Sequence, residues 1–209
     1  MRGHHVKLGE NSLLNNLTSR VNALSKMATN ATFQTLLMAA NGTFMSSLAY
    51  LIPFWAGTEG YLLKSLQVLQ NRAARTVTKM SWLTPTRILP NKCKCLSIKQ
   101  LVFYHSMFEV YKVLKAGTPL YLCKNLHTDH PYPARREADG WLWYLAGNMG
   151  RQSTAQNSFY GRAPRLYNSI PAEIRADAAL PTFKMKLKFW LKESIPIEWI
   201  EMKYYQHLF

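Results

Sequence analysis

Acidic residues are scarce in this chain of 209 residues, and their placement argues against one large class of catalytic site. The chain has 11 Asp and Glu residues against 26 Lys and Arg residues. The only aspartates are Asp129, Asp139 and Asp177, so there is no Asp-Asp pair, and no two Glu residues are adjacent. Nucleotide polymerisation uses two metal ions that are held by clustered carboxylates. We therefore expect no polymerase centre and no enzymatic activity of that kind.

Cysteines and long apolar runs are also few. The three cysteines are Cys93, Cys95 and Cys123. An odd count without a signal peptide favours free thiols in a reducing, intracellular compartment, either nucleus or cytoplasm. The spacing of Cys93 and Cys95 is tighter than the Cys-x₂₋₄-Cys pattern of zinc sites, so we expect no metal and no cofactor. The apolar run 48–55 is interrupted by Pro53 and is far shorter than the roughly 20 residues of a membrane-spanning helix.

Positive charge is abundant and is concentrated in acid-free stretches. The formal net charge is +15. No acid lies between Glu59 and Glu109, and the bases in that stretch are Lys64, Arg72, Arg75, Lys79, Arg87, Lys92, Lys94 and Lys99. A field of one sign concentrates polyanions, and each neutralised phosphate releases counterions. The sequence therefore predicts an RNA or DNA backbone as partner. A basic surface that only keeps the chain soluble is the alternative.

Apolar spacing predicts a mainly α fold, with a helical domain at 1–122, an irregular connector at 123–157 and short C-terminal helices in 158–209. Helices are expected at 12–27, 32–40, 43–51, 60–79, 98–114, 163–169, 171–176 and 181–192. Asn41-Gly42 is expected to interrupt or end the second helix, and Pro53 to stop the third. We expect a loop at 82–90 and a short hairpin around 141–145 within the connector.

Two of these helices carry basic rows. In 60–79, Lys64, Arg72, Arg75 and Lys79 lie off the apolar stripe, where they can face a phosphate backbone or form an ordinary solvated face. In 181–192, the bases Lys184, Lys188 and Lys192 recur every four residues, opposite Phe183, Leu187, Trp190 and Leu191. Such a helix can lie on nucleic acid or on an anionic membrane surface. We expect its apolar face to pack on the protein, and therefore no membrane association.

Two sequence blocks resemble one known family. The first spans Ser158 to Leu191 and is similar to the C-terminal end of reverse transcriptases from non-LTR, LINE-type retrotransposons. Its matching positions are Phe159, Arg162, Ala163, Leu166, Asn168, Pro171, Ile174, Arg175, Phe183, Lys184, Leu187, Lys188 and Leu191. Tyr167 and Ile170 stand where the family usually has Trp and Leu. The second block, Leu62 to Arg75, is similar to the thumb-region helix, with Leu66-Gln67 and Gln70-Asn71 in matching places.

The resemblance implies a thumb and post-thumb fragment of an RNA-directed DNA polymerase, without its palm, fingers or nuclease. It implies contacts to a template–primer-like RNA or DNA duplex without sequence specificity, and association with other parts of the retroelement protein. The predicted contact residues are Lys64, Arg72, Arg75, Lys79, Arg87, Arg162, Arg165, Lys184, Lys188 and Lys192. Three alternatives stay open: a helical interaction module, a non-functional remnant, or an enzyme that gathers His105, His127, His130 or Glu109 in one pocket.

Overall fold

A computed structural model describes residues 3–55, 60–123, 126–127, 142–144, 159–177 and 179–193. These residues are mainly helical, which confirms the predicted fold class. The chain divides into two compact units, of which unit 1 comprises residues 1–52 and 58–101, and unit 2 comprises residues 53–57 and 102–209. The division falls inside two helices, α3 (Ser46–Trp55) and α6 (Ile98–Ala116). The predicted boundaries after residues 122 and 157 stay predictions, because much of the connector lies outside the described residues.

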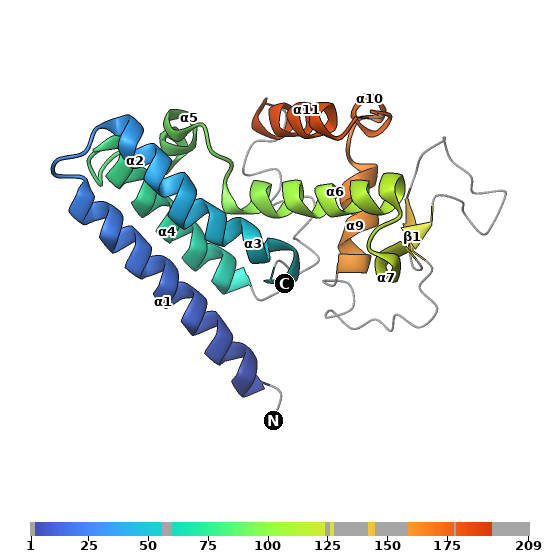
Figure 1. Ribbon diagram of the computed structural model, residues 1–209, viewed down its shortest axis with the longest axis horizontal. Coiled ribbons are helices and arrows are strands. Elements are labelled where there is room, and N and C mark those ends of the chain that lie inside the picture. The colour runs from blue at the N-terminus through green and yellow to red at the C-terminus, as the bar shows by residue number, and fades with distance from the viewer. Residues whose placement is uncertain are drawn as a thin grey trace. The chain divides into compact units, whose positions relative to one another are not determined.

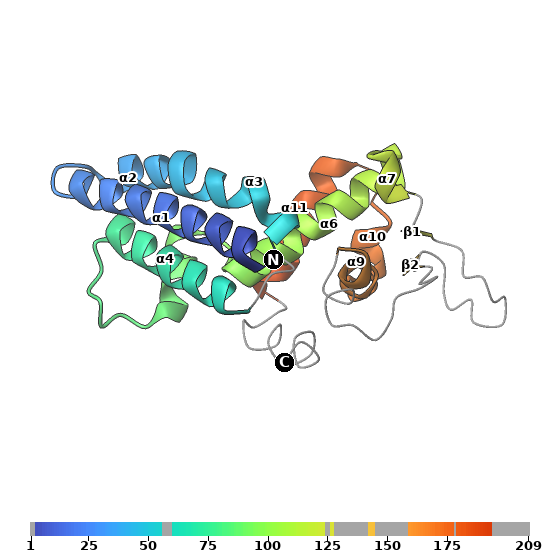
Figure 2. The ribbon, with the colours of Figure 1, turned by 90° about the horizontal axis from the view of Figure 1, so that it is seen from below.

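Unit 1 is built on helices that run side by side in both views of the molecule (Figures 1 and 2). Its elements are α1 (Gly3–Met27), α2 (Phe33–Ala40), the π-helical turn η1 (Asn41–Met45), α3 (Ser46–Trp55) and α4 (Gly60–Thr78). Each helix places one apolar stripe in a shared core. Its fully or almost fully buried members include Leu17, Val21, Leu24, Leu36, Phe44, Leu48, Leu62, Leu66, Ala73 and Val77. Packing of this kind stabilises helices more than intrinsic propensity does.

The chain stays helical from α2 through η1 into α3, so Asn41-Gly42 interrupts the α-helix, as one form of the prediction had it, but does not end the helical segment. A π-helical turn takes up one extra residue without ending the helix. Phe44, within that turn, is buried, and this packing holds the segment in place. The prediction that Pro53 stops the helix is wrong, because α3 continues to Trp55. Proline removes one helical hydrogen bond, and burial of the adjacent Ile52 offsets that loss.

The segment after α4 is more ordered than the predicted loop. Residues 81–84 form a turn, but a 3₁₀ turn, η2 (Thr86–Ile88), and a short helix, α5 (Leu89–Cys93), follow it. Pro90 lies in the first turn of α5, where its missing N–H is not needed. Leu89 is fully buried, and its burial draws this segment onto unit 1. The loop prediction is therefore right for 82–85 and wrong for 86–90.

Unit 2 packs short C-terminal helices onto α6. Its other elements are α7 (Leu120–Cys123), β1 (Leu126–His127), β2 (Trp143–Tyr144), α9 (Phe159–Asn168), α10 (Ala172–Arg175) and α11 (Leu180–Glu193). Aromatic contacts join α11 to α6: the rings of Tyr111 and Phe183 stack with centroids 4.6 Å apart, and those of Phe103 and Trp190 lie 5.8 Å apart. The apolar face of α11 thus packs on the protein, as expected. Among the described residues, no helix is both long and apolar enough to cross a membrane.

Within the predicted connector, the described residues form a small antiparallel ladder. Leu126 pairs with Tyr144, and His127 pairs with Trp143. A short hairpin was expected around residues 141–145, but the strand at 143–144 pairs with residues 126–127 rather than with a partner inside that run. Asn168 fixes this ladder to α9, because its Oδ1 accepts from the Leu142 N–H at 2.8 Å and its Nδ2 donates to the Leu142 carbonyl at 3.0 Å. A side-chain amide thereby satisfies both backbone groups of a fully buried residue.

Replacing Asn168 by alanine should destabilise unit 2. The substitution leaves the N–H and the carbonyl of Leu142 without their partner, and an unsatisfied buried polar group costs about 1–3 kcal/mol. Urea unfolding followed by circular dichroism should show a lower midpoint for Asn168→Ala. Glu173→Ala, at an exposed position of α10, serves as the control and should leave the midpoint unchanged. Equal midpoints for the two variants would show that the paired hydrogen bonds add nothing to stability.

Candidate nucleic-acid interface

The bases of α4 point away from the core of unit 1. An α-helix turns by about 100° per residue, so Lys64, Arg72 and Arg75 fall within an arc of about 80°, opposite the buried stripe. Lys64 and Arg72 are exposed, and Arg75 is half-buried. Lys79 follows the end of α4 in a left-handed conformation with φ 54° and is also exposed. We call these four residues the α4 basic row.

Unit 1 holds most of the net charge of the chain. It has twelve of the 26 Lys and Arg residues but two of the 11 acidic residues, which leaves it ten of the 15 net positive charges. The two acids are Glu10 and Glu59, whose side chains lie outside the described part of the chain. The described side chains of unit 1 therefore include no carboxylate that could neutralise the α4 basic row. A surface of this kind is an electrostatic footprint for a polyanion.

Two arginines of the row are held in place by hydrogen bonds. Arg72 Nη2 donates to Asn22 Oδ1 of α1 at 2.9 Å, and Arg75 Nη2 donates to the Thr84 carbonyl at 3.2 Å. A guanidinium group has five N–H donors in a rigid fork, so one bond orients the group and leaves others for a phosphate. These two arginines are thus oriented before any ligand arrives. Arg87, on η2 in the same unit, is exposed as well.

The other predicted contact residues lie in unit 2 and differ in their surroundings. Arg165, Lys188 and Lys192 are exposed. Lys184 is half-buried, and its Nζ lies 3.9 Å from the centre of the Phe108 ring, so cation–π attraction engages its charge. Arg162 is buried, with an exposed fraction of 9%. Its position within α9 serves packing, and the placement does not suit the phosphate contact expected of it.

The polar residues of the second resembling block have structural partners. Gln70 Nε2 donates to the Leu96 carbonyl at 2.7 Å, and Gln67 Oε1 accepts from the Ile98 N–H at 2.9 Å. Gln67 Nε2 also donates to Gln70 Oε1 and Asn71 Oδ1, both at 3.0 Å. These glutamines fasten the start of α6 to α4. The two glutamines of this block therefore hold the start of α6 against α4, and they are used for that contact rather than for a ligand.

Sequence reasoning missed one exposed feature of unit 1. Trp82 and Leu83 have exposed fractions of 79% and 72%, in the turn that follows the α4 basic row. The predicted loop at 82–90 includes these two residues, but the sequence predicted no role for them. Two large apolar residues among the bases Lys79 and Arg87 were the available signal, because turns favour small or polar residues.

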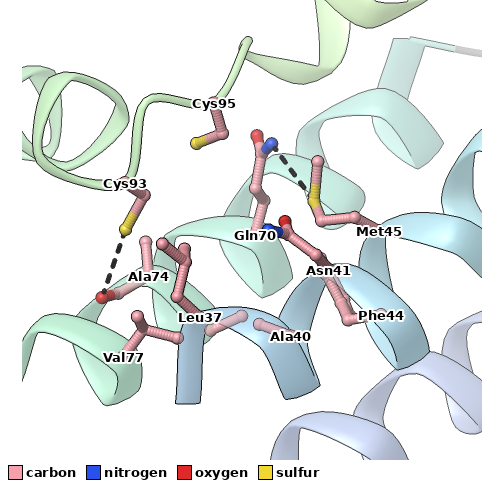
Figure 3. Close-up of a pocket in the computed structure, with 11 residues that line it drawn as sticks. Leu37, Ala40, Asn41, Phe44, Met45, Gln70, Ala74, Val77, Cys93 and Cys95 are labelled. Carbon is pink, nitrogen blue, oxygen red and sulfur yellow. Dashed lines mark hydrogen bonds between the residues drawn. The ribbon is translucent and has the colours of Figure 1, made fainter. Parts of the chain in front are cut away.

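A small apolar pocket lies between α2, η1, α4 and the segment around α5 (Figure 3). Its lining includes both close-spaced cysteines. The Cys93 thiol points to the Ala74 carbonyl, with Sγ 3.9 Å from the oxygen, and burial raises the pKa of this thiol. A protonated, half-buried thiol is a poor nucleophile and a poor metal ligand. Within the described residues, no group of three His, Cys, Asp or Glu side chains could hold a metal ion.

The residues of the enzyme alternative are only partly described. His130 and the side chain of His127 lie outside the described residues. His105, on α6, is half-buried with its ring 5.4 Å from that of Tyr104. Burial lowers the pKa of His105 below its ordinary value of 6.5, with Glu109 acting in the opposite direction. Glu109 is paired with Lys112 at 2.8 Å. His105 therefore has the surroundings of a neutral packing residue.

The lowered pKa of His105 predicts a pH-dependent contribution to stability. Between the folded pKa and 6.5 the unfolded chain binds more protons, so the free energy of unfolding falls as pH drops through that window. Above 6.5 the contribution is constant. His105→Gln should reduce the loss of stability between pH 7.5 and pH 5.5, as measured by urea midpoints. The wild-type chain is the control, and equal pH dependence in both proteins would contradict a neutral, buried His105.

Comparison with protein-family models, with curated proteins and with solved structures gives no match. The functional interpretation of the α4 basic row therefore depends on its residues and on the sequence resemblance alone.

Proposed function

We propose that this chain is a non-catalytic fragment of a retrotransposon reverse transcriptase that binds RNA or DNA without sequence specificity. The α4 basic row is the observation that carries the proposal, since it gathers positive charges on the outward side of a helix, in a unit that has twelve basic and two acidic residues. The resemblance of Leu62 to Arg75 to a thumb-region helix supports the same conclusion. A helical interaction module or a non-functional remnant would give the row no ligand.

The geometry of the row suits a phosphate backbone. From Lys64 to Arg75 the helix rises 1.5 Å per residue, so these charges extend over about 16 Å. A line of charge along a rod matches a linear polyanion. Contacts to phosphates position a nucleic acid but read no sequence. If each of the four residues of the row neutralises one phosphate, the slope of log K against log salt should be about −3 to −4 for duplex DNA.

The proposal assigns no chemistry to the chain itself. The sequence has no Asp-Asp pair that could hold the metal ions of a polymerase centre. A thumb-like fragment would bind the nucleic-acid backbone, and a separate protein with a palm domain would have to supply catalysis. Unit 2 carries exposed bases of its own, among them Arg165, Lys188 and Lys192, which would offer further contacts to phosphates.

Neutralising the row should weaken binding and flatten its salt dependence. The triple variant Lys64→Gln, Arg72→Gln and Lys79→Gln removes three positive charges and keeps polar side chains. Each lost phosphate contact should reduce the magnitude of the salt slope by about 1. Fluorescence anisotropy on labelled duplex DNA, single-stranded RNA and an RNA–DNA hybrid, titrated with salt, measures both effects.

The matched control removes the same number of charges from other exposed positions: Lys92→Gln, Lys94→Gln and Lys115→Gln. This control should lose far less affinity than the row variant and should keep the wild-type slope within about one unit. Equal losses in both triples would mean that diffuse charge, rather than the row, binds the ligand. A wild-type slope near zero would contradict nucleic-acid binding and favour the interaction module.

A further inference from the structure

Trp82 and Leu83 occupy the tip of an ordered turn. The Thr84 N–H donates to the Ser81 carbonyl at 3.0 Å, which closes a four-residue turn with Trp82 and Leu83 as its central residues. The Leu83 N–H also donates to Ser81 Oγ at 3.3 Å. Both hydrogen bonds tighten the turn, so the two apolar side chains are presented outward in a defined place. Their exposed fractions of 79% and 72% are among the largest of the apolar residues.

Turn tips of folded domains normally carry Gly, Asn, Asp or Ser, because these residues suit turn backbones and are well hydrated. A tryptophan side chain can bury 150–250 Å² of surface, so leaving it in water forgoes a large favourable free energy. The described part of unit 1 has a buried core that uses neither Trp82 nor Leu83. The folded unit alone gives these two residues no packing role, and a ligand would give them one.

The turn is fixed beside the α4 basic row. Arg75, a member of the row, donates from Nη2 to the Thr84 carbonyl at 3.2 Å and so ties the turn to α4. Lys79 joins the row to the turn, and its left-handed φ of 54° redirects the chain at that point. Arg87 lies three residues beyond the turn. The apolar tip is therefore held between positive charges, which is the arrangement that single-strand-binding proteins use for bases and phosphates.

We infer that the Trp82–Leu83 turn is a stacking element for an unpaired base, positioned so that the neighbouring phosphates contact the α4 basic row. The inference deepens the proposed function and depends on it. Stacking needs only the π-face that every base has, so it adds no sequence preference. A blunt duplex offers no unpaired base to the indole. The preferred ligand is thus a nucleic acid with a single-stranded segment, either alone or next to a duplex.

An anionic membrane surface is the competing occupant, because Trp beside Lys and Arg is also common at lipid interfaces. Binding along a lipid surface normally uses a helix with a broad apolar face. On α4, the outward side carries the basic row, and Val68 is the large apolar residue that is exposed among the described side chains of this helix. Two apolar residues at a turn offer little area to a bilayer, whereas one indole is enough for one base. The observations therefore favour nucleic acid.

The test compares Trp82→Ala and Trp82→Phe with the wild-type full chain. The ligands are a blunt DNA duplex, the same duplex with a single-stranded overhang that contains 2-aminopurine, and the single strand alone. Trp82→Ala should weaken binding to the two ligands with unpaired bases by about five- to hundred-fold. Its affinity for the blunt duplex should stay within about two-fold of wild type, and Trp82→Phe should restore most of the loss. Wild type should quench 2-aminopurine fluorescence, and Trp82→Ala should not.

Tyr50→Ala is the matched control, because Tyr50 is an aromatic residue of the same unit with an exposed fraction of 80%. It should leave all three affinities within about two-fold of wild type. Circular dichroism should show unchanged helicity in every variant, since each altered side chain lies at the surface.

The outcomes separate this inference from the proposed function. Salt-dependent binding that Trp82→Ala leaves unchanged, or weakens equally for all ligands, overturns the stacking element and leaves the α4 basic row intact. Absence of salt-dependent binding to any oligonucleotide overturns both. Loss of binding to phosphatidylserine vesicles in Trp82→Ala, with oligonucleotide affinities unchanged, would overturn the inference in favour of a membrane surface.

Discussion

The burial of one side of α4 decides the direction of its charged side chains, and the candidate interface depends on that constraint. Leu62, Leu66 and Val77 are almost fully buried in unit 1. Because side chains on a helix keep fixed angular positions, this burial turns Lys64 and Arg72 toward solvent. A rotation of α4 that hid the charges would expose the leucines and bury lysine and arginine without partners, which costs several kcal/mol per ion. The same orientation of α4 therefore produces both the apolar core and the outward basic row.

Side-chain amides that hydrogen-bond to backbone groups add directional contacts to the apolar core. Gln67 and Gln70 satisfy backbone groups at the start of α6, and Asn168 does the same for Leu142 in unit 2. Each of these hydrogen bonds holds a stretch of backbone at or just before the start of a helix or strand. Hydrophobic burial is non-directional, whereas these amide groups accept and donate along defined lines. They therefore specify where α6 starts and where β2 attaches, which a stripe of leucines could not do.

The sequence predicted the helices that have strong apolar periods and failed where a local rule met tertiary packing. The period in 60–79 predicted α4 almost to the residue, and with it the outward bases. Gly42 and Pro53 are helix breakers in isolation, but burial of Phe44 and Ile52 carries the helix through both. Arg162 was predicted to lie at the surface because charged side chains usually do, but it is buried in α9. Only three-dimensional neighbours reveal which of these positions obey local preference.

The residues that carry the family resemblance are, to a large extent, residues that hold the structure together. Gln67, Gln70 and Asn168 bind backbone, and Phe183 packs on α6. A resemblance carried by such residues speaks for a common way of packing more strongly than for a common activity. The functional proposal must then depend on the surface. There, the outward row of bases on α4 and an apolar turn tip beside it are features that folding alone does not require, and a ligand with phosphates and bases would account for both.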